Sequence, residues 1–354
     1  MIRKWMAMIL AGLVLCTGCV AEGQTIDSKT AHEVVTCLFA AAAGTNADRE
    51  KELFSRMTEE EETAHIAGNA AYRKSVLPWL TEVLVYQEET GKQVTDDETP
   101  EENEKDTDPE VMAEMALQKG RMEAAFLAMS NNEEGRKYLD QLYLLDAEDE
   151  ETCLELTRSS FQVWLSEIEP QRLRAMNEDY LFWLFAPDSP IDYPVVQGTD
   201  NAYYLHRLFD GEINSAGTLF ADYRNLPTLE DPNTLVYGHH MRNDSMFGSL
   251  DWYEKQEYYE SHPYMLLVGE NEINLIELFA GYTTKSDDEC YDIAISDEED
   301  LMEFTETAKR KSDFISDTEI MKNDRLITLS TCAYAFQNAR YIVIGRLLPT
   351  WRRI

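Results

Sequence analysis

The sequence predicts a chain in two parts, an α-helical segment at residues 26–170 and a mainly β domain at residues 171–354. Three observations predict this division. Before Pro170, apolar residues recur at helical spacing. After Pro170, Tyr, Val, Ile and Thr gather in short apolar runs that Gly, Asn and Asp interrupt, as is typical of strands. A length of 354 residues is sufficient for two domains and at least one sizeable core.

The helical segment begins with "AHEVVTCLFAAAAG", which consists of good helix formers and ends at a glycine. "YRKSVLPWLTEVLVYQ" follows, with its apolar residues on one helical face. Residues 88–110 are strongly acidic and almost free of apolar side chains, so we expect a disordered loop there. Helical spacing resumes from Asp108 and Pro109 and returns in "EETCLELTRSSFQVWLSEIE".

Seven runs in the second part predict strands. They are "IDYPVVQ", "AGTLFADY", "NTLVYGHH", "HPYMLLVG", "NLIELFAGYTT", "DRLITLSTC" and "ARYIVIGRLL". One amphipathic helix, "EEDLMEFTETAKRKS", separates the fifth run from the sixth. Seven or eight short strands over this length predict an antiparallel or mixed barrel or sandwich.

The composition excludes one large class of function. The net charge is −36, and nucleic-acid binding needs a basic surface to neutralise phosphates. His and Cys residues show no metal-ligand spacing, so we expect no metal and no cofactor. Cys37, Cys153, Cys290 and Cys332 form no CxxC pair. We expect Cys37 and Cys153 to pack as small hydrophobic residues rather than to form disulfides.

The N-terminus is typical of an export signal. Arg3 and Lys4 precede twelve mostly apolar residues, a run too short for a comfortable membrane-spanning helix. Small residues then lead to Cys19, as in a bacterial lipoprotein signal. We therefore expect a signal peptide at residues 1–19, with Cys19 as a candidate lipidated residue. An uncleaved anchor and an ordinary cleaved signal are the alternatives, and all three place the chain outside the cytoplasm.

Three residues at predicted strand ends suit acyl transfer. His239 follows the strand in "NTLVYGHHM", Cys332 ends the strand in "DRLITLSTC", and Arg340 opens the next strand. A thiolate can attack a carbonyl carbon, an imidazole can move the protons, and a guanidinium can stabilise the developing oxyanion. Residue types alone indicate this chemistry only weakly.

The short sequence motifs around these residues are more specific than the residue types. "TLVYGHHM", "ITLSTC" with Arg340 eight residues on, and "SPIDYPVVQGTDNAYYL…AGTLFADYRN" together resemble the class B sortases of Gram-positive bacteria. The resemblance covers residues 177–348. It implies a sortase-type β-barrel with a few helices and a transpeptidation reaction. The enzyme would cleave a sorting signal similar to NPxTx or LPxTG after Thr, and an amine of a cell-wall peptide or of a pilin would resolve the thioester.

The resemblance also implies residue roles. His239 matches the catalytic histidine, Cys332 the nucleophile and Arg340 the arginine of the family. Five further residues match positions in or beside its substrate groove: Asn201, Leu205, Tyr237, Ser330 and Thr331. His240 stands where the family often has Asn, so we expect it to be a polar neighbour only. Ala333 replaces the polar residue that commonly follows the cysteine.

Two departures keep alternatives open. About 145 residues precede the domain, more than the family usually has, and a lipoprotein-like signal is unusual for it. An inactive sortase-like module that binds sorting signals at the cell surface is one alternative. An L,D-transpeptidase is another, although its motif places Arg directly after the cysteine. The expected partners are a signal-bearing surface protein, an amine nucleophile and the membrane, with no nucleic acid. The expected location is the extracytoplasmic face of the membrane.

Overall fold

The computed structural model describes residues 26–84, 120, 123–145, 150–270, 272–285, 288–295, 297–332 and 339–352. The expected signal peptide at 1–19 with Cys19, the expected loop at 88–110, and Ala333 lie outside these residues.

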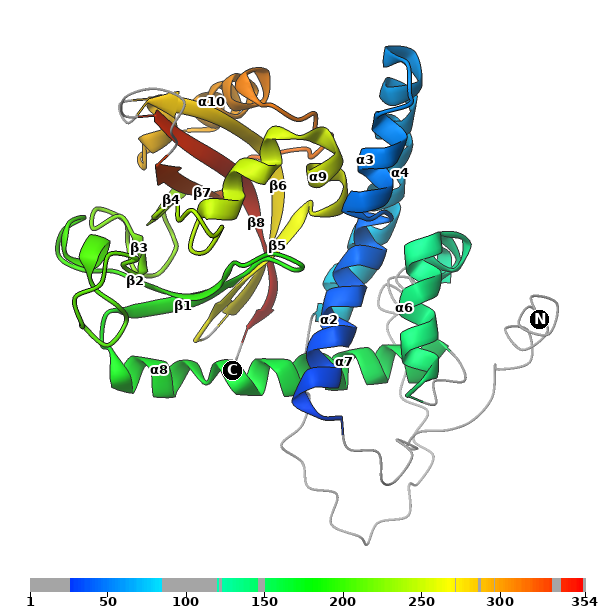
Figure 1. Ribbon diagram of the computed structural model, residues 1–354, viewed down its shortest axis with the longest axis horizontal. Helices are drawn as coiled ribbons and strands as arrows, with labels where there is room; N and C mark the ends of the chain where they lie inside the picture. Colours follow the sequence, from blue (N-terminus) through cyan, green and yellow to red (C-terminus); the bar gives the residue numbers. More distant parts are fainter. Residues whose placement is uncertain are drawn as a thin grey trace, which may run out of the picture.

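Eight strands form a closed barrel in the order β1-β2-β3-β4-β7-β8-β6-β5 (Figure 1). They are β1 (Tyr180–Phe185), β2 (Asp192–Val196), β3 (Leu219–Ala221), β4 (Asn233–Gly238), β5 (Tyr264–Gly269), β6 (Glu272–Lys285), β7 (Arg325–Cys332) and β8 (Ala339–Arg352). The β2–β3 and β4–β7 pairs are parallel and the other neighbouring pairs are antiparallel. The expected mixed barrel is therefore confirmed.

Strand β1 is the element that the sequence patterns missed. Its sequence, "YLFWLF", is a continuous apolar run with no polar alternation. Phe182 and Leu184 face the barrel core, whereas Phe185 packs against the helical segment. A strand covered on both faces loses the period-two signal, so its sequence is not distinguishable from a buried helix.

The helical segment contains α2 (Ser28–Ala43), α3 (Ala47–Phe54), α4 (Glu59–Leu84), α6 (Glu133–Tyr143), α7 (Glu150–Ile168) and α8 (Pro170–Met176). Asp27 caps the start of α2 by accepting a hydrogen bond from the Thr30 N–H. Gly44 ends that helix with φ 81°, a left-handed conformation that glycine adopts without strain. The predicted helices at residues 31–44 and 150–169 are confirmed, and α4 begins earlier than its apolar stripe suggests.

The helical segment shares a hydrophobic core with one side of the barrel. Helices α2 and α4 stand beside the barrel and α7 runs along its base (Figure 1). This core combines Val34, Leu38, Leu80, Phe161 and Trp164 with Phe185, Tyr264, Leu266, Val268 and Leu275. The rings of Trp164 and Phe185 lie 4.9 Å apart between centroids. The helices therefore cover a face of β1, β5 and β6 that would otherwise be exposed and apolar.

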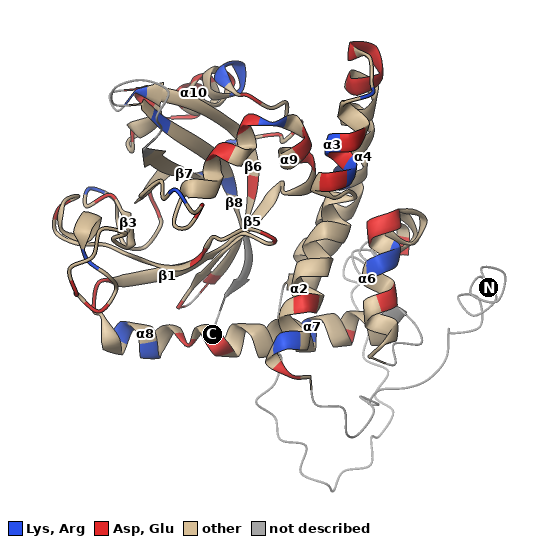
Figure 2. Cartoon of the chain, viewed as in Figure 1, with Lys and Arg blue, Asp and Glu red and all other residues tan. Residues whose placement is uncertain are grey.

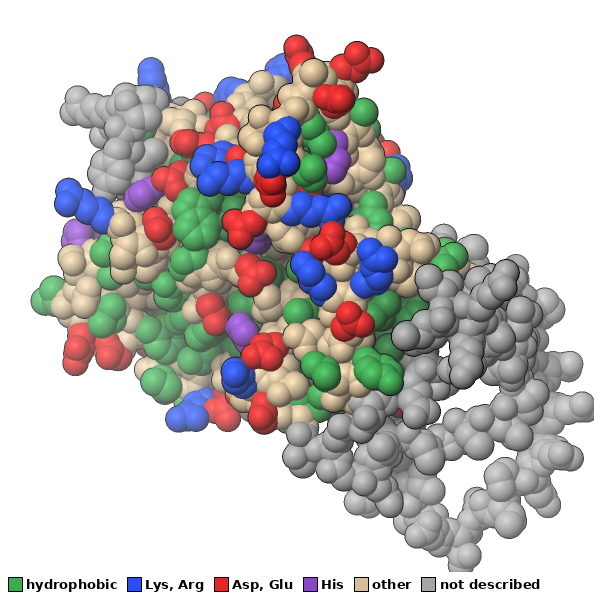
Figure 3. Space-filling view, turned by 45° about the vertical axis from the view of Figure 1, so that its right-hand side comes forward, with side chains coloured by type: hydrophobic (Ala, Val, Ile, Leu, Met, Phe, Trp, Pro, Cys, Tyr) green, Lys and Arg blue, Asp and Glu red, His purple; other side chains and the backbone are tan. Residues whose placement is uncertain are grey.

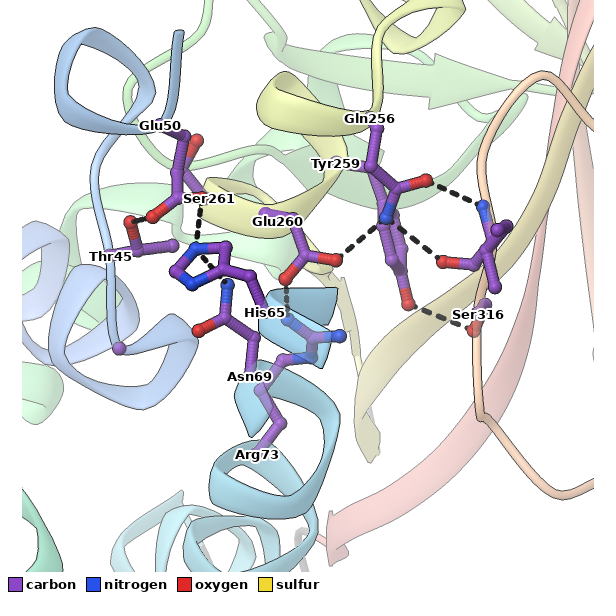
Figure 4. Close-up of polar contacts among 12 residues, drawn as sticks. Thr45, Glu50, His65, Asn69, Arg73, Gln256, Tyr259, Glu260, Ser261 and Ser316 are labelled. Carbon is purple, nitrogen blue, oxygen red and sulfur yellow. Dashed lines mark hydrogen bonds and ion pairs between the residues drawn. The ribbon is translucent and has the colours of Figure 1, made fainter. Parts of the chain in front are cut away.

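A buried ion pair reinforces this junction (Figure 4). Arg73 on α4 donates to Glu260 on α9 (Gln256–Ser261), with Nη1 and Oε2 2.6 Å apart. The two side chains are only 7% and 0% exposed. Gln256 donates to the other carboxylate oxygen of Glu260 at 2.7 Å, and Tyr259 donates to Ser316 at 2.8 Å. The network thus links α4, α9 and the chain that leads towards β7.

Four short helical elements and one longer helix complete the barrel domain: η1 (Tyr203–His206), η2 (Gly248–Glu254), α9, η3 (Glu289–Tyr291) and α10 (Glu298–Lys311). Helix α10 confirms the predicted amphipathic helix. It carries acidic residues in its first turn and Lys309, Arg310 and Lys311 in its last, which complements the helix dipole.

Acidic residues are distributed over both the helices and the barrel (Figure 2). On the face shown in Figure 3, basic and acidic side chains are interspersed. Among the described residues, no helix has the length and apolarity needed to cross a membrane. Cys37, Cys153 and Cys290 form no disulfide within the described residues, and Cys153 and Cys290 are buried.

Candidate active site

The backbone brings His239, Cys332 and Arg340 to one edge of the barrel. Strands β4 and β7 are parallel neighbours, and their last register pair joins Gly238 to Thr331. His239 and Cys332 are the residues that directly follow this pair. Cys332 is in turn the cross-strand partner of Arg340 on β8. The register therefore places Cys332 opposite Arg340, with His239 one residue beyond the end of the neighbouring strand β4.

Gly238 allows β4 to end in this position. A Cβ atom at residue 238 would collide with the side chains of Leu219 and Phe247. Both are fully buried core residues. The close packing of β3 and of the loop before η2 against this point therefore requires glycine at the residue that precedes His239.

The imidazole of His239 has one nitrogen engaged by the backbone. Its Nε2 lies 2.6 Å from the carbonyl oxygen of Leu205 in η1. Since a carbonyl oxygen only accepts, Nε2 carries the proton of this hydrogen bond. Nδ1 is then the ring nitrogen left for proton exchange with a reacting group. The ring also stacks on His206, with centroids 5.8 Å apart and planes 21° apart.

His240 has a different environment. Its Nε2 lies 2.7 Å from Oδ2 of Asp251 in η2. The side chain of His240 is only 12% exposed. The two histidines therefore contact different elements, η1 for the first and η2 for the second, and His240 has a structural partner of its own.

Asn201 and Tyr237 converge on a carboxylate that sequence reasoning did not select. Asp222 follows β3 and is fully buried. Its Oδ2 accepts hydrogen bonds from Asn201 Nδ2 at 3.0 Å and from Tyr237 Oη at 2.9 Å. Arg224 donates to both carboxylate oxygens at 2.8 Å. The "DYRN" motif contains this residue, but only the fold shows which side chains it meets.

The electrostatics of this cluster follow from its contacts. Burial pushes the pKa of Asp222 upward, but hydrogen bonds from Arg224, Tyr237 and Asn201 outweigh burial and lower that pKa to about 2. Burial and the adjacent Asp222 charge raise the pKa of Tyr237 well above its ordinary value. Near neutral pH the carboxylate is thus ionised and the phenol protonated.

Ser330 and Thr331 precede the cysteine on β7 and are 2% and 1% exposed. The Ser330 hydroxyl lies 2.8 Å from the Tyr291 hydroxyl in η3. Tyr291 stacks on Tyr237, with centroids 6.2 Å apart and planes 17° apart. Tyr291, another residue that the sequence did not single out, therefore connects β7 to the Tyr237 side of the site.

The guanidinium of Arg340 is half-buried, and its Nη1 donates to the Ala339 carbonyl oxygen at 3.0 Å. Within the part of the chain that the structure describes, no group of His, Cys, Asp and Glu side chains has the arrangement of a metal site.

Known proteins share this architecture. A family model described as "Sortase domain" matches residues 184–348. Sortase B of Listeria monocytogenes is 34% identical over 182 residues, which span 51% of this chain and 74% of that protein. Sortase B of Staphylococcus aureus is 31% identical over 216 residues, 59% of this chain and 88% of its own length.

Solved structures agree with the sequence relatives. The Staphylococcus aureus sortase B–substrate complex aligns with a TM-score of 0.50 at 30% identity and covers 53% of this chain and 91% of that one. A structure of Staphylococcus aureus sortase B aligns with the same TM-score and identity, over 55% of this chain and 96% of that one.

Proposed function

The chain belongs to the sortase B family, and from this premise we propose that it is a thiol transpeptidase with Cys332 as nucleophile, His239 as acid and base, and Arg340 as oxyanion partner. The observation that carries the proposal is the strand register, which sets Cys332 opposite Arg340 and pairs Gly238 with Thr331, the residues just before His239 and Cys332. The three residues carry the groups that acyl transfer needs.

The proposed first half-reaction cleaves a peptide. The Cys332 thiolate attacks the carbonyl carbon of the Thr residue in a sorting signal, and a C–S bond forms. As the C–N bond breaks, protonated His239 gives a proton from Nδ1 to the leaving amine. The product is a Cys332 thioester together with the C-terminal fragment of the substrate.

The second half-reaction transfers the acyl group. An incoming amine attacks the thioester carbonyl carbon, and neutral His239 takes the proton that the amine loses. The C–S bond then breaks and the thiolate of Cys332 is regenerated. A sortase B relative has been solved in complex with triglycine, so we propose a peptide amine of this kind as the nucleophile.

The Leu205 carbonyl supports these proton transfers. Because it accepts a hydrogen bond from Nε2, it fixes the ring plane of His239 and the tautomer that leaves Nδ1 for proton exchange. It also stabilises the imidazolium form that exists before the first half-reaction and again after the second. Arg340 supplies a fixed positive charge for the oxyanion of each tetrahedral intermediate.

We propose that Asn201, Leu205 and Tyr237 border the peptide groove, with Ser330 and Thr331 as its buried floor. The expected signal is similar to NPxTx or LPxTG. Residues 171–354 would form the catalytic domain. Residues 26–170 would form a helical layer that supports it through their shared core.

We further propose that the protein acts at the extracytoplasmic face of the membrane, held there through residues 1–19 or a lipid on Cys19. Membrane fractionation of cells that express the full chain tests this proposal. Cys19→Ser should move the protein out of the membrane fraction if a lipid is the anchor.

A product assay tests the function. The purified protein is incubated with peptides that contain Asn-Pro-X-Thr or Leu-Pro-X-Thr-Gly, with and without triglycine. Mass spectrometry should show cleavage after Thr and a triglycine adduct on the new C-terminus. Binding of these peptides without any cleavage would support an inactive surface module instead.

A further inference from the structure

The Asp222 carboxylate collects donors from three segments of the chain. Oδ1 accepts from the backbone N–H of Arg224 at 3.0 Å and from Arg224 Nε at 2.8 Å. Oδ2 accepts from Arg224 Nη2 at 2.8 Å, from Asn201 Nδ2 at 3.0 Å and from Tyr237 Oη at 2.9 Å. The carboxylate that accepts these hydrogen bonds is fully buried, and its negative charge is balanced by donors in fixed positions.

These contacts fix the position of residues 197–206, the segment that contacts His239. Asn201 lies in the loop before η1, and its Oδ1 accepts from the Tyr223 N–H at 3.0 Å. Gln197 secures the start of the same loop by donating to the Asp222 carbonyl oxygen at 2.8 Å. Four residues after Asn201, the Leu205 carbonyl holds the His239 imidazole. Asp222 thus anchors one end of a segment whose other end contacts the proposed acid–base residue.

The same contacts leave defined hydrogen-bonding capacity on two side chains. Asn201 uses one of its two N–H groups and one lone pair, so one donor and one acceptor remain. Tyr237 uses its hydroxyl proton towards Asp222, so its oxygen remains an acceptor. A donor and an acceptor on one amide match the C=O and N–H groups of an extended peptide.

We propose that Asp222 is a positioning residue of the transpeptidase site: its carboxylate orients Asn201 and Tyr237 towards the peptide backbone and holds the 197–206 segment against His239. This inference rests on the proposed function and deepens it, since it names what sets the substrate groove. Asp222 itself is buried and touches neither the substrate nor the reacting atoms.

The proposal explains why an acid stands at this position. Donors point at both oxygens, and an asparagine would offer one oxygen and one NH₂ group. In either orientation the NH₂ group faces donors, which are Arg224 Nε and N–H on one side and Asn201 and Tyr237 on the other, so the cluster loses an acceptor and its negative charge. Asp222→Asn therefore keeps the shape of the residue but misorients the groove side chains.

The test compares Asp222→Asn with Asp231→Asn. Asp231 lies in the adjacent β3–β4 loop and accepts from Asn225 Nδ2 at 2.8 Å and from the Leu226 N–H, but it contacts no groove residue. Two quantities are measured: steady-state constants with the Asn-Pro-X-Thr and Leu-Pro-X-Thr-Gly peptides, and hydrogen exchange of residues 198–206. For Asp222→Asn we expect KM to rise about tenfold with a smaller change in kcat, and faster exchange in that segment. The control should match the wild type in both.

The results that would overturn the positioning role of Asp222 are distinct from those that would overturn the proposed function. If Asp222→Asn matches the control in both measurements, the positioning role is wrong. Faster exchange with unchanged KM would overturn the claim that Asp222 sets the groove. If the wild type cleaves none of the peptides, the proposed function fails. The positioning role is then tested by hydrogen exchange alone, and unchanged exchange of residues 198–206 in Asp222→Asn would overturn it. Should Asp222→Asn not fold, Tyr237→Phe removes only the hydroxyl that faces Asp222 and should raise KM in the same way.

Discussion

Cys332, the last residue of β7, lies directly opposite Arg340, the second residue of β8, in an antiparallel pair. Such a pairing fixes the two Cα atoms at cross-strand distance whatever the intervening loop does. The parallel β4–β7 pair joins Gly238 to Thr331, the residues just before His239 and Cys332. The backbone pairing of Cys332 with Arg340 is therefore a property of the barrel itself, and the neighbouring strand ends just before His239.

The two adjacent histidines should respond differently to substitution. His239→Ala should lower kcat/KM by about a thousandfold or more, because both proton transfers lose their carrier. His240→Asn should keep most activity and lower the free energy of unfolding by about 1 kcal/mol, since it loses the partly exposed Asp251 pair. Steady-state kinetics and urea unfolding of both variants check this. Equal losses of activity would show that the roles are assigned wrongly.

Arg340 should act mainly on the transition state. Arg340→Ala should lower kcat by about a hundredfold with a small change in KM, because the oxyanion loses a fixed charge that the ground state uses little. Arg340→Lys should restore only part of the rate, since an ammonium cannot reproduce the planar guanidinium donors. A variant with raised KM and normal kcat would assign Arg340 to substrate binding instead.

The helical segment should contribute strongly to the stability of the barrel. Arg73→Ala leaves the Glu260 carboxylate buried without its cation and should cost about 3–5 kcal/mol of unfolding free energy. The exposed Lys74–Glu319 pair, 2.9 Å between Nζ and Oε1, provides a matched control at the next position. Lys74→Ala should leave the urea midpoint nearly unchanged. If both variants unfold at the same urea concentration, the buried pair does not secure the junction.

His262 should make the fold sensitive to mild acid. Burial lowers the pKa of its imidazole below 6.5, against weaker opposite effects of the Tyr258 carbonyl and Asp188, and the ring stacks on Tyr258 at 4.1 Å between centroids. The unfolded state therefore binds a proton first, and stability falls as the pH drops through about 6.5. Thermal unfolding at about pH 8 and about pH 5.5 should show a smaller acid-induced decrease for His262→Gln. His32→Gln, at an exposed position on α2, should behave like the wild type.

The sequence predicted the helices and strands that either have one solvent-facing side or are bounded by turn residues. Strands β2 to β8 and helix α10 carry alternation, turn residues or an amphipathic stripe, and each lies where these signals indicate. Strand β1 was missed because its apolar run has no alternation, whereas the equally apolar run of β5 is bounded by Pro263 and Gly269. The core shared by the helical segment and the barrel was not predicted either. The spacing of apolar residues shows which face of a helix is apolar, but not that β1, β5 and β6 lie against that face.

The residues of the candidate site were predictable from the sequence, but the residues that position them were not. The strand ends at His239 and Cys332 are visible as motifs, whereas Asp222 required knowledge of what surrounds it. Its partners Asn201 and Tyr237 are 21 and 15 residues away in the chain. No local pattern records such a convergence, because it depends on how β3, β4 and the loop before η1 pack.

Covalent capture of a peptide on Cys332 is the sharpest test of whether this residue is the nucleophile. The wild-type protein is mixed with a sorting peptide, quenched in acid within seconds, digested, and examined by mass spectrometry. We expect an acyl adduct of the N-terminal peptide fragment on Cys332, which hydroxylamine removes and which is missing in Cys332→Ala. Cleavage of the peptide by Cys332→Ala, or an adduct on Cys290 in place of Cys332, would contradict this expectation.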